Sequence, residues 1–417
     1  MTPFEEARQQ LCERAAPLGT ESVALSGSDG RVTACAVVSD MDLPPFDNSA
    51  MDGFSLASGQ ACGAGAEVDV TGEQAAGDSQ RRAGAGSWEV MTGARMPEGF
   101  DTVVPVENVE VVARSRDGRP ARIRLLAGPR PGQHVRLRGQ DIAAGEVAVP
   151  AGRWIDPSVA MLLGGIGVAR VEVRRRPRVA LLCTGRELVD APETALGGGQ
   201  IYNTNGPFLA RRLALAGADV VVNRTIPDDP EAFAEAVRQC QATGVDLVVS
   251  TGAVSMGRYD FVPGVLHAMG ASLVFHKVGM RPGKPLLAAV LPSGEICVGL
   301  PGNPVSSAVG ERFFVEPVIR RMLGLPDEQP WRLPLAAGVE KKPALTMIQK
   351  AALELGPGGQ VRVRLLAGQE SFRTRPLLDS RAWALLPAGV ATLAAGDLVD
   401  VHPLGHSDTN LFQRSQT

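Results

Sequence analysis

Three short runs of glycine and small polar residues each follow a run of apolar residues, and turns of this kind can hold an anion. They are Cys183-Thr184-Gly185, Ser250-Thr251-Gly252 and Leu300-Pro301-Gly302-Asn303-Pro304. Glycine lets backbone N–H groups approach a ligand closely, and the start of a following helix favours negative charge. The three runs together predict a cradle for a phosphate or another oxyanion. For any one of them, an ordinary glycine-rich strand-to-helix turn is the alternative interpretation.

Carboxylates lie close to the same turns. Glu187, Asp228 and Asp260 each follow an apolar run or its glycine-rich turn by a few residues. Mg²⁺ is usually held in proteins by one or two carboxylates together with oxygens of the substrate. These side chains therefore predict Mg²⁺ bridging an anionic substrate. Each acid could instead cap a helix, and that role is favoured for Asp229 because Pro230 follows it.

A lysine at position 284 stands out in a chain that prefers arginine. Lys+Arg number 42, and only five of these residues are lysine. Lys284 lies between Gly283 and Pro285, so this turn keeps a compact ammonium where arginine is the usual choice elsewhere in the chain. Contact with a phosphate or oxyanion is the predicted use, and a solvated turn lysine is the alternative.

A second polar cluster lies far from the first in the sequence. Residues 44–54 are rich in turn-forming and polar residues, yet they include three large apolar side chains, which a surface turn rarely carries. The polar side chains that this predicted structured loop would present are Asp47, Asn48, Ser49 and Asp52. Residues 91–97, with Thr92, resemble the Thr-Gly turns described above. We therefore expect a site that is shared between domains or between subunits.

The elements that must position these groups follow from the apolar periodicity of residues 178–323. It predicts alternating strands and helices, which is typical of a parallel sheet whose ligands bind beyond the carboxyl ends of the strands. The expected strands are residues 178–185, 218–226, 246–252, 272–278 and 296–300. The expected helices are residues 205–217, 230–240, 261–269 and 304–323.

The flanking regions differ from this pattern. A first helix is expected from Pro3 to about Ala16, with Thr2 as its cap. Residues 23–170 contain short apolar runs broken by Gly, Pro, Asp and Asn, which predicts a β-rich region with one helix at 157–163. Strand signals return from Trp331 onwards, and the polar tail after residue 404 is expected to be disordered.

Composition excludes several classes of protein. The net charge of -3 gives no basic excess for binding nucleic acid. The longest apolar run, residues 159–169, is shorter than the roughly 18 residues of a membrane helix. The first ten residues lack a basic and apolar leader, which predicts a cytoplasmic protein. The six cysteines form no C-x-x-C pair and are interpreted as small buried residues, and the neighbouring His402 and His406 are not expected to bind metal.

Several longer strings together resemble one family. They are PPFDNSAMDGF, TGARMPEGFDTVVPVE, Arg138-Gly139-Gln140-Asp141-Ile142, TGREL, TGAVSMGRYDF, GMRPGKP and GLPGNPVSS, in that order. This order resembles the MoeA family of molybdopterin molybdenumtransferases, to which the E domain of gephyrin is related. The resemblance extends over nearly the whole chain to about residue 325.

The resemblance implies an α/β plus β chain with several domains, assembled as an elongated homodimer. Residues 1–49 and 134–173 would form an N-terminal linker domain, and residues 50–133 an inserted β-domain. Residues 174–326 would form a three-layer parallel α/β domain of the Mog type that binds molybdopterin. Residues 327–404 would form a C-terminal β-barrel, followed by the tail 405–417.

The implied reaction inserts molybdate into adenylylated molybdopterin, hydrolyses the adenylate, and releases molybdenum cofactor and AMP with Mg²⁺ present. The catalytic positions carried over are Asp52, Thr92, Asp141, Glu187, Asp228, Asp260 and Lys284. The substrate-binding positions are Thr184, Gly185, Ser250, Thr251, Gly252, Ser255, Arg281, Pro301, Gly302, Asn303, Pro304 and Ser371. The metal ligands would be Asp52, Glu187 and Asp260. A Mog-type adenylyltransferase would donate the substrate, and molybdoenzyme maturation proteins would be further partners.

The chain departs from the family pattern in three places. Gln140 stands where the family usually has Glu, and Ala253 stands where Gly is usual. The C-terminal segment 368–389 keeps the Gln and Ser of the family motif but lacks its run of small residues. Two alternatives to the implied enzyme are a Mog-type molybdopterin adenylyltransferase, which resembles the α/β domain alone, and a binding, scaffold or carrier protein of the same fold.

Overall fold

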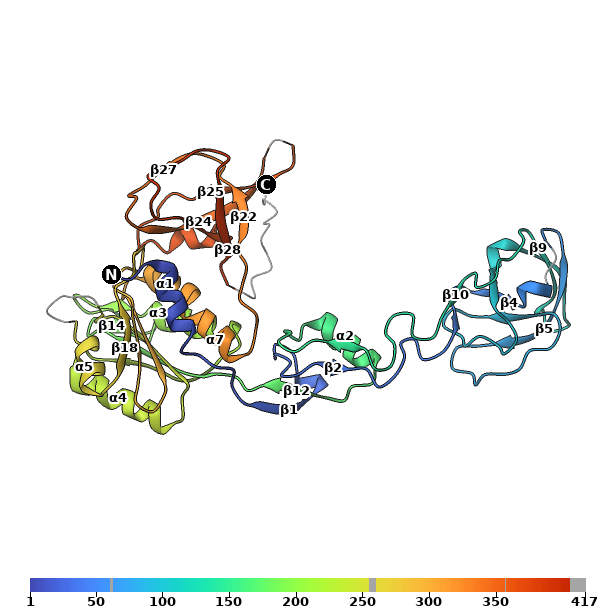
Figure 1. Cartoon of the computed structure of the whole chain (residues 1–417), viewed down its shortest axis with the longest axis horizontal. Helices are drawn as coiled ribbons and strands as arrows, with labels where there is room; N and C mark the ends of the chain where they lie inside the picture. Colours follow the sequence, from blue (N-terminus) through green and yellow to red (C-terminus); the bar gives the residue numbers. More distant parts are fainter. Residues whose placement is uncertain (61–62, 255–259, 357, 406–417) are drawn as a thin grey trace.

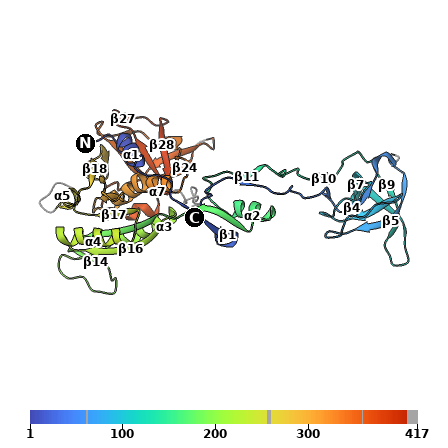
Figure 2. The same cartoon turned by 60° about the horizontal axis from the view of Figure 1, so that its bottom comes forward.

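A computed structural model describes the whole chain except residues 61–62, 255–259, 357 and 406–417. The chain is elongated (Figures 1 and 2): an α/β domain and the C-terminal β-domain lie together at one end, a small linker domain lies in the middle, and a β-domain lies at the other end. Among the described residues, no helix has both the length and the apolar character needed to cross a membrane.

The linker domain is formed by segments from both sides of the inserted domain. Strand β1 (Thr20–Ala24) pairs antiparallel with β12 (Arg170–Arg174), and β2 (Val37–Val38) pairs with β11 (Val147–Val149). Helix α2 (Pro157–Gly165) begins where it was predicted, because the Asp156 side chain accepts a hydrogen bond from the Val159 N–H. The short η1 (Leu25–Gly27) lies beside α2.

The inserted domain is a six-stranded sheet in the order β7-β4-β6-β5-β9-β8. Its strands are β4 (Gly53–Leu56), β5 (Glu67–Gln74), β6 (Ser87–Val90), β7 (Thr102–Pro105), β8 (Val109–Arg114) and β9 (Pro120–Leu125), with η2 (Ser58–Gln60) and η3 (Val106–Asn108) between them. A core that includes Phe54, Leu56 and Ile123 packs inside it. The domain is joined to the linker domain through two antiparallel strands, β3 (Asn48–Ser49) and β10 (Val135–Arg136).

The α/β domain has a six-stranded sheet in the order β16-β13-β17-β21-β20-β18. The strands are β13 (Arg178–Thr184), β16 (Asp219–Ile226), β17 (Leu247–Thr251), β18 (Ser272–His276), β20 (Leu287–Val290) and β21 (Ile296–Leu300). The prediction of an alternating sheet is confirmed for β16, β13, β17 and β21, which are parallel. Strand β20 was missed and is antiparallel to both neighbours, so the sheet is mixed.

Helices cover both faces of this sheet. One core lies under α3 (Asn205–Leu215) and the helix that starts at α6, and the other lies under α4 (Pro230–Ala242) and α5 (Val262–Ala268). The predicted helix 304–323 consists of α6 (Pro304–Gly310), a π-helical segment η4 (Glu311–Val315) and α7 (Glu316–Met322). Pro317 lacks the N–H that an α-helix would bond to residue 313, and the wider π turn lies just before it. The short strands β14 (Leu188–Val189) and β15 (Ile201–Tyr202) form a separate parallel pair.

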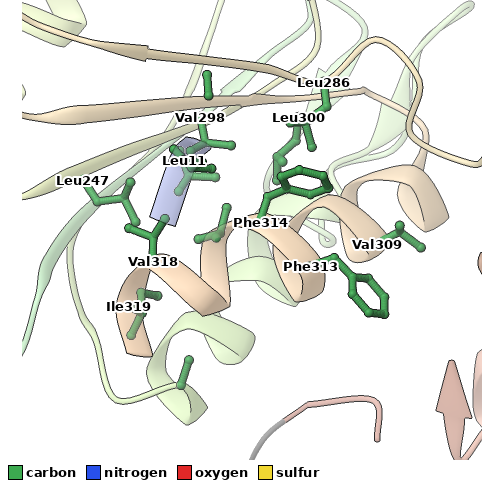
Figure 3. Close-up of a cluster of buried hydrophobic side chains, with 14 of the residues drawn as sticks. Leu11, Leu247, Leu286, Val298, Leu300, Val309, Phe313, Phe314, Val318 and Ile319 are labelled. Carbon is green, nitrogen blue, oxygen red and sulfur yellow. The ribbon is translucent and has the colours of Figure 1, made fainter. Parts of the chain in front are cut away.

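The first helix belongs to this core rather than to the linker domain (Figure 3). Helix α1 (Phe4–Cys12) buries Leu11 beside the buried residues of the α6–α7 region, and the Phe4 ring contacts Phe313 and Phe314 edge-on at 5.9 and 5.6 Å. The prediction that Thr2 caps it is wrong, because the Thr2 N–H donates to the Lys277 carbonyl and pairs with the sheet edge instead. The helix also ends earlier than predicted, at Cys12 rather than near Ala16.

The C-terminal domain is a small barrel, as expected. Its strands are β22 (Trp331–Pro334), β24 (Thr346–Leu355), β25 (Val361–Leu365), β26 (Ala382–Leu386) and β28 (Leu398–Pro403), with η5 (Arg375–Leu378) and the ribbon β23 (Val339–Glu340)–β27 (Thr392–Leu393) outside it. They pair in the order β25-β24-β26-β28-β22. A bridge between Leu335 and Val363 connects the end of β22 to β25 and closes the circle. Strand β19 (Met280–Arg281) of the α/β domain pairs with β24, so the two domains share a strand contact.

A buried ionic network also joins these two domains. Arg312, which is 1% exposed, donates from Nε to the Pro403 carbonyl at 3.0 Å and from Nη2 to both Glu328 oxygens at 2.6 and 2.7 Å. His402 is buried, its Nδ1 lies 3.4 Å from Glu328 Oε2, and its ring contacts Phe313. Burial raises the pKa of Glu328, but His402 and Arg312 outweigh it and lower that pKa to about 2. His402 is therefore part of the buried contact between the two domains.

Three of the five cysteines that the structure describes are buried as predicted, and Cys62 lies outside the described residues. Cys183, Cys240 and Cys297 are buried, and burial raises the pKa of each thiol. Cys35 is the exception: it is exposed, in the loop that precedes β2 in the narrow linker domain, where few elements are available to cover it. Cys12 is half-buried.

Candidate functional site

The carboxyl ends of β13, β17 and β21 converge on a cavity of about 730 Å³. Its lining contains the predicted residues Thr184, Glu187, Thr251, Gly302, Asn303 and Pro304. It also contains residues that were not predicted: Leu188, Ile201, Tyr202, Asn203, Thr204, Asn205, Phe372 and Thr374. The structure thus brings all three predicted turns, at Thr184, Thr251 and Gly302, to one edge of the sheet, where an open sheet is expected to bind its ligand.

Hydrogen bonds connect the strand ends at this edge. The Thr184 hydroxyl donates to the Thr251 carbonyl at 2.9 Å, and the Gly252 N–H donates to the Leu300 carbonyl at 2.9 Å. Gly252 has a φ of +90°, and a Cβ there would lie 2.6 Å from Thr184 Oγ1. Only glycine therefore allows the Thr251 turn to close against the Thr184 turn. Ser250 is buried in β17, and Ser255 lies outside the described residues.

The predicted acids of this domain lie around the same turns. Glu187 is half-buried, and its Oε2 lies 2.9 Å from the position that a Cβ on Gly185 would take. The exposed Asp228 carboxylate accepts a hydrogen bond from the Arg186 N–H at 3.2 Å, so it is tied to the turn after β13. Asp260 is half-buried two residues before α5.

The Asp229 carboxylate and the Pro301 carbonyl, which lie near these turns, each stabilise the start of a helix. The Asp229 carboxylate caps α4 by accepting from the Ala232 N–H at 2.7 Å, which confirms the predicted cap. The Pro301 carbonyl accepts from the Ser307 hydroxyl, so it holds the start of α6 rather than facing the cavity. Asn303 is the first residue before α6 and is exposed.

Two asparagines that the sequence interpretation missed line the cavity. Asn205 Nδ2 donates to the Gly302 carbonyl at 2.8 Å. Asn203 Nδ2 donates to Thr225 Oγ1 at 2.9 Å, and its Oδ1 accepts from the Gly206 N–H at 2.9 Å. The run Asn203-Thr204-Asn205 at the start of a predicted helix was the available signal, because three polar side chains there exceed what one cap needs.

A second cavity, of about 690 Å³, lies between the α/β domain and the C-terminal barrel. Arg281 and Lys284 line it from the α/β side, and both are exposed. Ser371 lines it from the barrel side, and its carbonyl accepts a hydrogen bond from the Val305 N–H at 2.9 Å, near the start of α6. The structure therefore places the three predicted residues together. Phe372 lines both cavities, so the two adjoin.

Asp52 and Thr92 form a pair in the inserted domain. Asp52 Oδ1 accepts from the Thr92 N–H at 2.6 Å and from its hydroxyl at 2.9 Å, and these bonds lower the pKa of Asp52. Both residues are exposed. The following Gly53 is required by close packing, because a Cβ there would lie 2.2 Å from the Val104 carbonyl. The pair is thus an ionised carboxylate held on the domain surface.

One chain does not bring all the predicted acids together. Asp52 adjoins β4 and Glu187 adjoins β14, and these strands lie at opposite ends of the molecule (Figure 1). Asp141 is exposed on the segment between the two ends, with its N–H bonded to the Leu43 carbonyl at 2.9 Å. Within the described ranges, no three His, Cys, Asp or Glu side chains are grouped as a metal site would require. The expected set of Asp52, Glu187 and Asp260 is therefore divided.

Gln140 and Ala253, which depart from the family pattern, both lie at bends of the chain. Gln140 Oε1 accepts from the Leu137 N–H at 3.0 Å, a bond within its own turn. Ala253 has a φ of +51°, a left-handed conformation that favours glycine. The non-glycine residue at this position therefore carries backbone strain.

Comparisons with known proteins agree with this architecture. The model of the MoeA N-terminal region, domains I and II, matches residues 2–167, that of a probable molybdopterin binding domain matches 180–321, and that of the MoeA C-terminal region, domain IV, matches 332–404. A molybdopterin molybdenumtransferase of Synechococcus elongatus is 37% identical, covering 93% of this chain and 95% of that protein. One of Haemophilus influenzae is 30% identical, covering 97% and 99%.

The fold agrees as well. The crystal structure of a molybdopterin biosynthesis MoeA protein from Pyrococcus horikoshii superposes with a TM-score of 0.80 at 26% identity, covering 96% of this chain and 99% of that one. The three matched regions together cover most of the chain, and the relatives match over nearly their whole length. The chain belongs to the MoeA family.

Proposed function

We propose that the chain transfers molybdenum from molybdate into adenylylated molybdopterin, releasing AMP and molybdenum cofactor. The observation that carries this proposal is the pair of adjoining cavities at the carboxyl edge of the sheet. One offers glycine turns and carboxylates, and the other offers Arg281 and Lys284, so together they suit a substrate with an anhydride and an oxyanion. Relatives of similar length are named molybdopterin molybdenumtransferases.

The chemistry needs charge stabilisation more than a covalent partner. A water molecule attacks phosphorus and breaks the bond to the bridging oxygen, so negative charge develops on the phosphoryl oxygens and the leaving group. Arg281 and Lys284 would offset that charge, and backbone N–H groups of the Gly302-Asn303 turn would bind phosphate oxygens. Glu187 or Asp228 would orient the water and accept its proton.

The proposed active unit is a homodimer. The exposed, ionised carboxylate of Asp52 and its hydrogen-bond donor Thr92 lie in the inserted domain, at the end of the molecule opposite the cavities. If a second copy packs antiparallel to the first, its inserted domain lies beside the cavities and completes the set of acids. This assigns the pair a role that one chain alone does not give it.

Mg²⁺ is part of the proposal because carboxylate oxygens are its usual protein ligands. Both hydrogen bonds from Thr92 reach Asp52 Oδ1. Among the described residues no side chain bonds to Oδ2, so this oxygen is the one that would bind the cation. Asp52 of one copy, with Glu187 and Asp260 of the other, would hold the ion. When bound, it would neutralise charge on the phosphoric anhydride. A Mog-type adenylyltransferase would supply the adenylylated substrate.

The test is AMP release from adenylylated molybdopterin by the purified chain with Mg²⁺, with and without molybdate. The product is scored by its ability to activate an apo-molybdoenzyme. Molybdate-dependent AMP together with active cofactor is the expected result. Bound adenylate that is never cleaved would contradict the proposal and favour a carrier of the same fold.

Asp52→Asn tests the role of the distal pair. It should lower turnover at least about 100-fold, because the variant loses the charge that would hold the ion. Asp117→Asn is the matched control, since Asp117 is an exposed acid of the same domain whose pKa is lowered by the Ser115 hydroxyl. Wild-type turnover in Asp52→Asn would overturn the assignment. Light scattering at the 43.7 kDa of one chain would contradict the homodimer.

A further inference from the structure

Phe372 is an aromatic side chain placed at the boundary of the two cavities. Its side chain is 65% exposed, although it is among the larger apolar residues of the C-terminal domain. It lines both the cavity at the sheet edge and the cavity that holds Arg281 and Lys284. A single exposed phenylalanine needs no explanation by itself. The position of Phe372 between the two cavities and the contacts that hold its loop indicate a role in binding a ligand.

The loop that carries Phe372 is fixed from below by a buried lysine. Lys350 is 0% exposed, and its Nζ donates to the carbonyls of Arg373 and Glu370 at 3.2 and 3.4 Å. These carbonyls lie on either side of Phe372. Burial lowers the pKa of Lys350, so the ammonium depends on these acceptors for its stability in the barrel.

Two further contacts fix the same loop. Gln369 accepts from the Lys350 N–H at 3.0 Å and donates to the Lys350 carbonyl at 2.9 Å, which forms a closed pair of hydrogen bonds. On the other side, the Ser371 carbonyl accepts from the Val305 N–H of the α/β domain. The backbone of loop 369–373 is therefore held by both domains, which fixes the position from which the Phe372 ring projects.

Charges surround the ring where a phosphate-bearing ligand would lie. The Arg373 guanidinium lies over the Phe372 ring, 5.8 Å from its centroid. Arg281 and Lys284 line the cavity on one side, and the Gly302 turn lines the cavity on the other. An apolar ring beside cationic side chains suits a molecule that joins a flat ring to phosphate groups.

We propose that Phe372 is the stacking surface for a planar heteroaromatic ring of the ligand that occupies these cavities, and that Lys350 is the positioning residue that holds it there. This inference rests on the proposed function, whose substrate contains two such rings, adenine and pterin. Stacking needs only a π face, so the shared chemistry is a flat nitrogen heterocycle carrying phosphate.

The test is calorimetric titration of the full-length chain with AMP, with 6-carboxypterin and with ribose 5-phosphate. Phe372→Ala should weaken binding of the ring that stacks by about 5- to 150-fold, the range for loss of base stacking on an aromatic side chain. Ribose 5-phosphate, which lacks the ring, should bind equally to both proteins. Leu355→Ala is the matched control, because Leu355 is another exposed apolar residue of the barrel, 69% exposed, that lines neither cavity.

The two probes distinguish the source of the ring. Loss confined to AMP identifies adenine, and loss confined to 6-carboxypterin identifies the pterin. Phe372→Trp should retain binding in either case. Unchanged affinity of Phe372→Ala for both ring ligands, or no binding of either by the wild-type chain, would overturn the inference.

Lys350 variants test the positioning role with the ring still present. Lys350→Met should lower affinity for the same ring ligand while leaving ribose 5-phosphate unaffected, and Lys350→Arg should restore part of the loss. Equal losses for ribose 5-phosphate would indicate general damage and contradict the role. AMP release measured on the same preparations separates the two proposals. If the wild-type chain shows Phe372-dependent ring binding but no turnover, only the proposed function is contradicted. If Phe372→Ala keeps normal turnover and KM, only this inference is contradicted.

Discussion

Replacing Glu328 by Gln should loosen the C-terminal barrel from the α/β domain. The variant keeps the shape of the side chain but removes the charge opposite Arg312, which is 1% exposed and donates to both Glu328 oxygens. Removing one partner of a buried ion pair typically costs about 3–5 kcal/mol, because the remaining charge is left uncompensated.

The pKa of Glu328 gives a second value for the same contribution. It is lowered from 4.5 to about 2, which at about 1.36 kcal/mol per pKa unit corresponds to roughly 3 kcal/mol. Because the pKa is lower in the folded chain than in the unfolded chain, the stabilisation is present above pH 4.5 and is lost as the pH falls toward 2. Glu328→Gln should lack this acid transition.

Hydrogen exchange followed by mass spectrometry measures the effect locally. A loss of about 3 kcal/mol should speed exchange of the β28 amides by about 150-fold near neutral pH. Peptides from β5 and β9 in the inserted domain are the internal control, since that domain lies at the other end of the molecule. Unchanged protection of β28, or equal losses in β5 and β9, would refute the assignment of this pair as the link between the domains.

Two other substitutions have defined outcomes. Gly252→Ala should weaken AMP binding by at least about tenfold, because the added Cβ would collide with Thr184 Oγ1. The control is Gly244→Ala, where the added Cβ would have no atom within 4 Å, and this variant should bind AMP normally. Glu311→Gln should remove a pH dependence measured by thermal unfolding. Burial raises the pKa of Glu311 to about 8, so the wild-type chain loses stability as the pH rises from 4.5 through 8, and the variant should not. Affinity of Gly252→Ala equal to that of Gly244→Ala, or parallel pH profiles for Glu311→Gln and the wild type, would contradict these assignments.

The sequence was sufficient for the alternating part of the fold and for the turns at its edge. Buried parallel strands have near-continuous apolar runs, so β13, β17 and β21 and the residues after them could be found from the pattern. Strand β20 could not, because its short run Leu287–Val290 follows a turn rich in Gly and Pro and has no helix beside it in the chain. The pairing with β18 and β21 is a long-range contact that local periodicity does not encode.

The residues of the candidate site that were predicted are those whose type suggests their chemistry. The residues that were missed are those whose role depends on where the fold buries or places them. The scarcity of lysine drew attention to Lys284, and the same argument applied to Lys350 would have marked it as well. Its neighbours Gln349 and Ala351 gave no sign that its ammonium is enclosed in the barrel and bonded to a loop beyond residue 368. Phe372 was likewise invisible, since only the structure shows that its ring lies between two cavities.

The connection between the linker and inserted domains is narrow, so the inserted domain can rotate about it as one body. The short strands β3 and β10 pair there, and a bridge between Leu43 and Ile142 joins the same two segments. Asp47 Oδ1 accepts from the Arg138 N–H at 2.7 Å, and Asp42 accepts from the Ala144 N–H at 2.8 Å. Over a long arm, a small rotation at the pivot becomes a large displacement of Asp52. The accuracy with which this carboxylate reaches any ligand is thus governed by the stiffness of a few hydrogen bonds at the pivot, far from the chemistry itself.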